Sequence, residues 1–366
     1  MYKYFFKLQR NTNEMNSIFK KIIVPIRRFI KFADNCFIKL ACRNSLLASF
    51  YYTFLSKAFY QEHKSALAGR VLYKNNNVIG YNPSVLLRRN IHRLEKGIII
   101  KPRRDVFAIS YIDDTVKAYE QMLSSCSNRN EASGEIQWAH DVLKEYFLIT
   151  SNFNQTINNA RSRFNKLSSM NSNNSCKPYY RNIPKKMPVE YEDLLFLSKL
   201  RRSVRFYKQT AVPHEIIDKA ISIAAQAPSA CNRQPYKFLV FDNPEKIKAV
   251  SEIPTGTKGF NHNFPGIIAI VGSLSAYFNE RDRHVIYIDS SLAAMAFIYA
   301  LEVQGVSSCV INWPDKPILE REMREVLKMK PDECLVMLLS YGYPDLNAMV
   351  PYSHKKELNQ IRTYNI

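Results

Sequence analysis

The chain has 366 residues, 46% of them hydrophobic, so it is long enough for two domains and apolar enough for a buried core. Its net charge of +20 is uneven: residues 1–190 carry 31 Lys+Arg and 13 Asp+Glu, a net of +18, which leaves +2 for the remainder. The seven cysteines form no CxxC pair and no metal-ligand spacing with histidine, which excludes a disulfide framework and predicts a cytoplasmic protein without a bound metal. No uncharged apolar run reaches about 18 residues, so we predict no membrane-spanning helix.

The first 70 residues alternate short apolar groups with single Lys or Arg residues. Pro25 is expected to divide residues 18–31 into two short helices, and a longer aromatic-rich helix is predicted over 44–66. A basic segment of this kind binds an anionic membrane surface or an acidic protein partner, or it packs on its own chain. Alternatively, the excess of positive charge has no binding role and reflects an AT-rich genome, which favours lysine codons. We do not predict nucleic-acid binding, and we keep a peripheral membrane location as the alternative to a purely cytoplasmic one.

Three further helices are predicted over 82–98, 113–123 and 136–147, which makes residues 1–166 an all-α, basic region. The first of them has Pro83 at its first helical position and Gly97 as its expected C-cap. Its polar face carries Arg88, Arg89, His92, Arg93, Glu95 and Lys96. The cluster from Arg89 to Gly97 is either a solvated surface or an anion or partner site. Residues 167–189, rich in Asn and Ser and ending in prolines, are the predicted linker.

From residue 190 onward the pattern alternates strands with helices. The predicted strands are 236–241, 266–272, 307–312 and 334–341. The predicted helices are 190–200, 213–227, 244–251, 286–304 and 315–328. This order and these short connections indicate one α+β domain over 190–366.

Two polar motifs flank the amphipathic helix predicted over 213–227. Arg201-Arg202-Ser203-Val204-Arg205 places three guanidinium groups and a hydroxyl within five residues, and residues 228–236 form a proline-bounded loop of small and amide side chains. We expect the two motifs to be the walls of an anion-binding cleft. The sequence has no glycine-rich nucleotide motif, no H-E-x-x-H and no G-x-S-x-G, and Cys231 has no nearby histidine to activate it. A site without an evident acid, base or nucleophile suggests that a bound cofactor carries the reaction.

The same two motifs resemble the nitroreductase family of FMN flavoproteins. The family pattern R-R-S-x-R-x-[FY], followed about 25 residues later by P-S-x-x-N-x-Q-P-[WY]-x-F, is matched by residues 201–207 and 228–238. The resemblance covers about 190–366 and leaves the N-terminal helical region outside. It implies a nitroreductase-like three-layer α+β fold around a central mixed or antiparallel sheet.

The resemblance also implies roles for particular residues. Arg201 and Arg205 would flank the FMN phosphate and the N1/O2 edge of the ring, because guanidinium forks suit phosphate and stabilise a reduced flavin. The full implied cofactor-binding set is Arg201, Arg202, Ser203, Arg205, Pro228, Ser229, Asn232, Gln234, Ile311, Asn312 and Lys355. Lys355 stands where the family more often has arginine, so a single ammonium group would replace a two-pronged guanidinium group at the phosphate contact.

The activity implied by the resemblance is that of a homodimeric FMN enzyme, with each site at the dimer interface and built from both subunits. NAD(P)H would give a hydride to flavin N5, and a small electron-poor acceptor such as a nitro compound or quinone would then take the electrons in a ping-pong mechanism. Relatives of this fold also dehalogenate aromatic rings, fragment flavin or oxidise ring systems. A further alternative is a membrane- or partner-binding protein whose flavin domain is vestigial.

Overall fold

The computed structural model describes residues 36–56, 58–79, 83–125, 133–151, 154–167, 176–181 and 184–365, together with Pro25. The chain divides into two compact units, residues 1–63 and residues 64–366. The two short helices predicted around Pro25 lie outside the described residues except for Pro25 itself. The linker predicted over 167–189 is described only in part, and a domain boundary at residue 190 stays a prediction.

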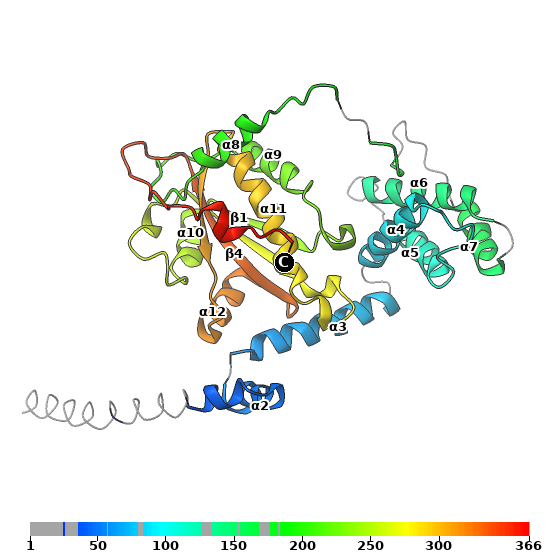
Figure 1. Ribbon diagram of the computed structural model, residues 1–366, viewed down its shortest axis with the longest axis horizontal. Helices are drawn as coiled ribbons and strands as arrows, with labels where there is room; N and C mark the ends of the chain where they lie inside the picture. Colours follow the sequence, from blue (N-terminus) through cyan, green and yellow to red (C-terminus); the bar gives the residue numbers. More distant parts are fainter. Residues whose placement is uncertain are drawn as a thin grey trace, which may run out of the picture. The chain divides into compact units, whose positions relative to one another are not determined.

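The first unit contains helix α2 (Ser45–Phe50), which is labelled in Figure 1 and drawn as a blue ribbon, and which continues into the π-helical turn η1 (Tyr51–Leu55). The continuous helix predicted over 44–66 is wrong. Ser56 adopts an extended backbone (φ −122°, ψ 136°), and its hydroxyl accepts a hydrogen bond from the N–H of Ala58 at 3.3 Å. A serine side chain that bonds the backbone two residues ahead competes with helix continuation, so the next helix, α3, begins only at Tyr60 and runs to Ile79.

The second unit includes a helical bundle of α4 (Pro83–Ile99), α5 (Ile112–Ser125), α6 (Ser133–Ile149) and α7 (Gln155–Asn165). The first three confirm the predicted helices, whereas α7 was not predicted because its sequence is mostly polar. Its core packs through fully buried side chains that include Leu87, Ile91, Leu94, Leu143 and Ile157. Gly97 is not a C-cap, because α4 continues to Ile99. A Cβ at Gly97 would clash with the Phe107 ring, so close packing explains this glycine.

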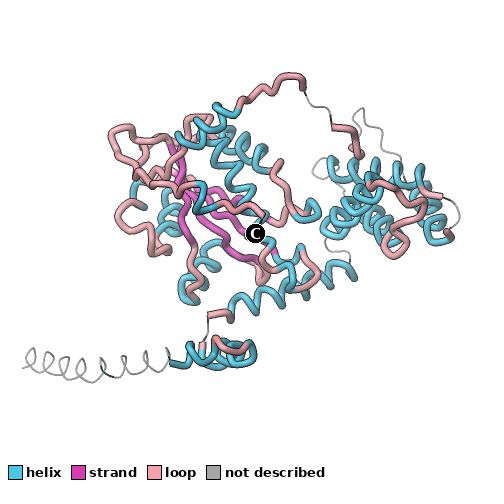
Figure 2. Tube along the Cα trace, viewed as in Figure 1, coloured by secondary structure: helices cyan, strands magenta, loops and turns pink. Residues whose placement is uncertain are grey.

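The central sheet has the strand order β1-β2-β4-β3, with every neighbouring pair antiparallel (magenta in Figure 2). Its strands are β1 (Tyr236–Phe241), β2 (Gly266–Ser273), β3 (Ser307–Asn312) and β4 (Glu333–Gly342). All four confirm the predicted strands to within one residue. A parallel bridge between Ser203 and Ser308 adds the arginine-containing segment beside β3.

Helices cover both faces of this sheet and make three layers. Helices α9 (His214–Ala224) and α11 (Val285–Glu302) pack on one face, where Ala220 and Phe297 meet Ile268 and Leu339. Helices α10 (Pro244–Ser251) and α12 (Pro317–Leu327) pack on the other, where Val250 and Met323 meet Ile267 and Leu338. The predicted three-layer α+β fold is therefore confirmed. Helix α8 (Tyr191–Leu200) precedes the arginine segment, and the short α13 (Leu358–Ile361) lies near the C-terminus.

Within the described residues, one helical stretch, Glu280–Glu302, is long and apolar enough to cross a membrane by length and composition. Half of its apolar window is buried, and α11, which makes up most of it, packs on the sheet through Ala293, Phe297 and Leu301. Core helices of soluble domains share this composition, so the packing itself explains the apolar sequence.

Candidate functional site

The arginine segment, residues 201–205, leaves α8 and runs beside the start of β3. The N–H of Val204 donates to the carbonyl of Ser308 at 3.1 Å. Tyr207 is buried, and its hydroxyl donates to the carbonyl of Val204 at 2.6 Å and lies 2.9 Å from Ser340 Oγ on β4. Burial raises the pKa of Tyr207, so its hydroxyl keeps the proton that holds this segment in place.

The guanidinium groups of this segment are half-buried and lack acidic partners. In the described part of the chain, no carboxylate forms an ion pair with Arg201, Arg202 or Arg205. Arg202 donates to the carbonyl of Arg201 at 3.0 Å, and the Arg205 guanidinium lies 5.6 Å from the centroid of the Phe260 ring. Three guanidinium groups without an ion-pair partner, beside a hydroxyl, suit an anion with several acceptor oxygens, such as a phosphate.

The half-buried Glu302 and the buried Cys309 border the arginine segment. Glu302, at the end of α11, accepts a hydrogen bond from the Ser307 hydroxyl at 3.3 Å, while its second oxygen is buried without a partner. Burial raises the pKa of this carboxyl, and the nearby Arg201 charge opposes that shift. Burial also raises the pKa of the Cys309 thiol, so Cys309 is not an activated nucleophile. Glu302 was not predicted as a site residue, although Asp289 and Glu302 are the only charged residues of α11 and so stand out in its sequence.

The second motif, residues 228–235, is a conformationally costly loop. Cys231, Asn232 and Gln234 have φ of 53°, 52° and 50°, in the left-handed region that glycine normally occupies. The Gln234 N–H donates to Ser229 Oγ at 3.1 Å, and the Gln234 amide donates to Asn232 Oδ1 at 3.0 Å. Such conformations persist where surrounding contacts over-determine them, and they cluster at functional sites.

Asp289, near the start of α11, anchors this loop through hydrogen bonds. It is 3% exposed and accepts hydrogen bonds from the N–H of Ala230 at 3.0 Å and from the Tyr277 hydroxyl at 3.3 Å. Burial raises the pKa of Asp289, and the bonds from Ala230 and Tyr277 oppose that shift. Arg233 stacks over the Tyr277 ring, 5.1 Å from its centroid. Asp289 was not predicted as a site residue, although a single carboxylate early in an apolar helix indicates a buried group with a specific role.

The two motifs lie at opposite ends of the domain. Tyr236, directly after the loop, pairs with Gly272, which pairs with Cys334 on β4, whereas Ser308, beside the arginine segment, pairs with Tyr341. From 334 to 341 is seven residues, roughly 24 Å along the strand. β1 and β3 are also the two edges of the four-stranded sheet. Within a single chain the two motifs therefore do not meet, and a cleft that uses both of them would need two copies of the chain, with each site built from both subunits as the resemblance implies.

Helix α11 gives an independent measure of this separation. Asp289 holds the loop near one end of the helix, and Glu302 borders the arginine segment at the other end. From 289 to 302 is thirteen residues, roughly 20 Å along the helix axis. Figure 1 shows α11 running along the sheet between these two regions.

The remaining predicted residues are spread over three places. Pro228 is exposed at the start of the loop. Ile311 is buried in the core, which leaves only its backbone for a ligand, while Asn312 is exposed at the end of β3. Lys355 is exposed in the C-terminal segment, and no hydrogen bond or ion pair joins it to other residues of the described chain.

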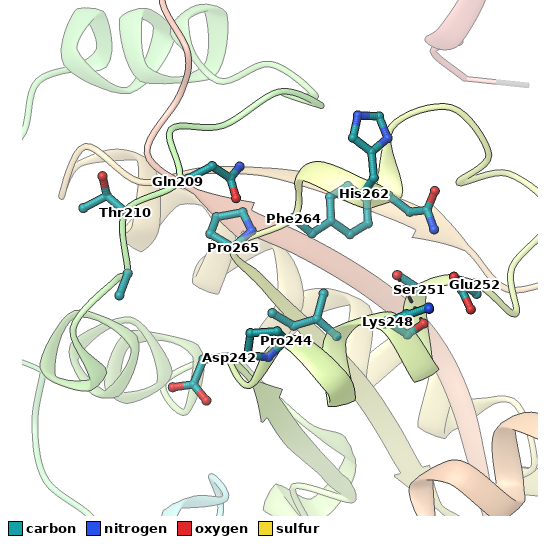
Figure 3. A pocket seen from close by; sticks show the side chains of 13 residues that line it. Gln209, Thr210, Asp242, Pro244, Lys248, Ser251, Glu252, His262, Phe264 and Pro265 are labelled. Carbon is teal, nitrogen blue, oxygen red and sulfur yellow. Dashed lines mark hydrogen bonds between the residues drawn. The ribbon is translucent and has the colours of Figure 1, made fainter.

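A cavity of about 500 Å³ opens elsewhere, beside α10 (Figure 3). Its lining includes Gln209, Asp242, Lys248 and His262, and none of the predicted cofactor-binding residues borders it. The cavity is thus separate from both motifs.

An arginine segment without ion-pair partners in the described chain and a strained amide-containing loop, both in a three-layer α+β domain, suit the binding of an anionic cofactor. Residues 199–258 and 252–343 match the sequence model of the nitroreductase family. This C-terminal part of the chain belongs to that family, and the helical region before it is an extension. The family is one of oxidoreductase-type flavoproteins.

Individual relatives are similar over about half of the chain. Iodotyrosine deiodinase 1 from Pongo abelii is 27% identical over 208 residues, which cover 48% of this chain and 70% of the relative. Iodotyrosine deiodinase from Hydra vulgaris is 25% identical over 217 residues, or 50% of this chain and 78% of the relative. Among solved structures, an FMN-dependent nitroreductase from Clostridium difficile is 26% identical, with a TM-score of 0.41, covering 47% of this chain and 99% of that one.

Proposed function

We propose that this protein is an FMN-dependent oxidoreductase. The observation that carries the proposal is the arginine segment, whose guanidinium groups have no acidic partner in the described chain, within a region that belongs to the nitroreductase family. When bound, FMN supplies the redox chemistry, taking a hydride at N5 from NAD(P)H and passing electrons to an acceptor. The protein supplies binding, orientation and electrostatics.

The residues present fit this cofactor. Arg201 and Arg205 offer forked donors for the phosphate or the anionic ring edge, and Ser203 adds a hydroxyl close to them. The amides of Asn232 and Gln234, fixed against each other at 3.0 Å, offer donors and acceptors for the polar edge of the ring. We also propose that FMN contacts the backbone of Ile311 and the side chains of Asn312 and Lys355.

We further propose a homodimer in which each site combines the arginine segment of one chain with the loop of the other. The support is geometric: within one chain the two motifs lie at opposite edges of the sheet and at opposite ends of α11. A two-fold axis places one end of a chain against the opposite end of its copy, so the interface is self-complementary.

The proposed acceptor is a small electron-poor molecule, such as a nitro compound or a quinone, reduced by a ping-pong mechanism. A second candidate is reductive removal of halogen from an aromatic ring, favoured by the relatives named iodotyrosine deiodinase. Steady-state assays with NADH and NADPH against a nitroarene, a quinone and a halogenated phenol separate the two. Halide release without nitroarene or quinone reduction would favour dehalogenation.

Cofactor identity is tested on the purified full-length chain. We expect a yellow protein that releases FMN on heating, and an Arg205→Ala variant that binds FMN about tenfold more weakly or worse. Lys208→Ala removes an exposed neighbouring charge and serves as the control. A colourless protein that gains no flavin absorbance on reconstitution would overturn the proposal.

For the first unit we propose attachment to an anionic membrane surface, which would make the protein peripheral to the membrane on its cytoplasmic side. Helix α2 and η1 bury no residue, and Leu46, Phe50 and Phe54 are 78%, 52% and 69% exposed. Residues 45–55 carry no charge, while residues 1–61 hold 11 Lys+Arg and 2 Asp+Glu, a net of +9. Eleven helical residues, roughly 17 Å long, are too short to span a bilayer but suit its interface.

Vesicle flotation tests this attachment. Full-length protein should float with phosphatidylcholine vesicles that contain phosphatidylserine, and Phe50→Asp with Phe54→Asp should abolish flotation. Leu148→Asp, at an exposed apolar position of α6, is the control that adds charge elsewhere. Equal flotation of the double variant and the wild type would show that the apolar face does not bind lipid.

A further inference from the structure

Helix α4 contacts the strained loop although it lies outside the family-matched residues 199–343. Arg88 on α4 donates a hydrogen bond from Nε to the carbonyl oxygen of Asn232 at 3.0 Å. Asn232 is the central left-handed residue of the loop, with φ of 52°. A guanidinium-to-carbonyl bond is charge-assisted, so it is stronger than an ordinary amide hydrogen bond.

The Arg88 side chain is itself held in place by α6. Its guanidinium pairs with Glu135 at 3.4 Å, and Ser84 donates to the other oxygen of that carboxylate at 2.6 Å. The guanidinium also lies 5.5 Å from the centroid of the Trp138 ring. The side chains of Arg88 and Glu135 are both only 18% exposed, so the pair is shielded from solvent. The contacts with Glu135, Trp138 and the Asn232 carbonyl leave Arg88 little rotamer freedom, which makes it a rigid support.

Arg88 and Asp289 hold the loop at two adjacent points. Asp289 on α11 fixes the backbone N–H of Ala230, and Arg88 on α4 fixes the carbonyl of Asn232, two residues later. Cys231, with φ of 53°, lies between the two anchors. Left-handed backbone costs about 1–2 kcal/mol per non-glycine residue, so the loop needs such anchors to keep one conformation.

We propose that Arg88 is a positioning residue for the flavin site, and that the helical extension thereby forms a working part of that site. This inference rests on the proposed FMN function. Arg88 orients Asn232 without touching the cofactor itself. A lysine cannot replace it, because a single ammonium group cannot reproduce a fork directed at both Glu135 and the Asn232 carbonyl.

The experiment compares Arg88→Ala and Arg88→Lys with Arg93→Ala in full-length protein. Arg93 lies on the same helix but bonds Asn90 and stacks on Tyr111 within the bundle, so its removal perturbs α4 without freeing the loop. Two quantities are measured: hydrogen exchange of the backbone amides in 229–236, which needs no cofactor, and the FMN dissociation constant. We expect both Arg88 variants to speed exchange in this segment and to weaken FMN binding about tenfold, with Arg88→Lys regaining little.

Arg93→Ala should leave both quantities near the wild-type values. Equal effects of Arg88→Ala and Arg93→Ala would show a general destabilisation of the bundle and overturn the inference. If Arg88→Ala does not fold, Arg88→Lys and Glu135→Gln carry the same comparison, because each weakens the anchor while keeping most of the packing. A wild type that binds no FMN would overturn the proposed function. Faster hydrogen exchange in the Arg88 variants would in that case still show that Arg88 anchors the loop.

Discussion

The buried carboxylate of Asp289 accepts a hydrogen bond from the backbone N–H of Ala230 at 3.0 Å, and so ties the core helix α11 to the strained loop. A buried carboxylate normally costs stability unless several donors satisfy it. Here the donors are one backbone amide and the Tyr277 hydroxyl, and burial still raises the pKa of Asp289. The core therefore keeps an unfavourable buried carboxyl where it shapes the loop.

Replacing Asp289 separates its hydrogen bonds from its charge. Asp289→Ala should lower the free energy of unfolding by about 1–3 kcal/mol, because the Ala230 and Tyr277 donors lose their buried acceptor. It should also weaken FMN binding, since the loop loses its anchor on α11. Asp289→Asn keeps an acceptor oxygen and should stay close to the wild type. Urea unfolding and FMN titration measure the two effects, and an Asp289→Asn variant as impaired as Asp289→Ala would contradict this account.

The same carboxyl predicts a pH dependence. Because its pKa is raised in the folded protein, the folded state binds this proton more tightly than the unfolded chain does. Its stabilising contribution is fully present below the unfolded pKa, about 3.9, and is lost as the pH rises through the folded pKa. Asp289→Asn cannot titrate, so its stability relative to the wild type should increase between pH 4 and pH 7. A constant difference across that range would show that Asp289 does not titrate as stated.

The hydroxyl group of Tyr207 should stabilise the arginine segment. Tyr207→Phe removes the hydroxyl that donates to Val204 and contacts Ser340, and should lower the free energy of unfolding by about 1–2 kcal/mol. Tyr341→Phe is a matched control, because Tyr341 is also buried but its hydroxyl bonds no other described residue. FMN affinity should fall in Tyr207→Phe and not in Tyr341→Phe. Equal losses in both variants would assign the effect to core packing.

The sequence predicted the C-terminal fold well because each element carried a local signal. The strands are β-branched or aliphatic runs bounded by turn residues, and all four lie within one residue of their predicted positions. The break at Ser56 was missed because a single side-chain hydrogen bond decides it. Asp289 and Arg88 were missed as site residues for a related reason: their partners are backbone groups 59 and 144 residues away. Such contacts are set by tertiary packing and leave little local pattern.

The separation of the two motifs gives a direct test of the composite site. Arg205→Ala disables the arginine segment and Asn232→Ala disables the loop, so each variant alone should bind FMN poorly. If each site takes one motif from each chain, a mixed dimer has one site with both motifs intact and one with neither. Random mixing by unfolding and refolding makes half of the dimers mixed, so about a quarter of all sites should regain FMN.

If both motifs of a site came from one chain, mixing would restore nothing, because every chain carries one defect. Flavin absorbance of the mixture against the two separate variants measures the result. The wild type taken through the same unfolding and refolding is the control, and a mixture no more yellow than its components would exclude a site shared between subunits.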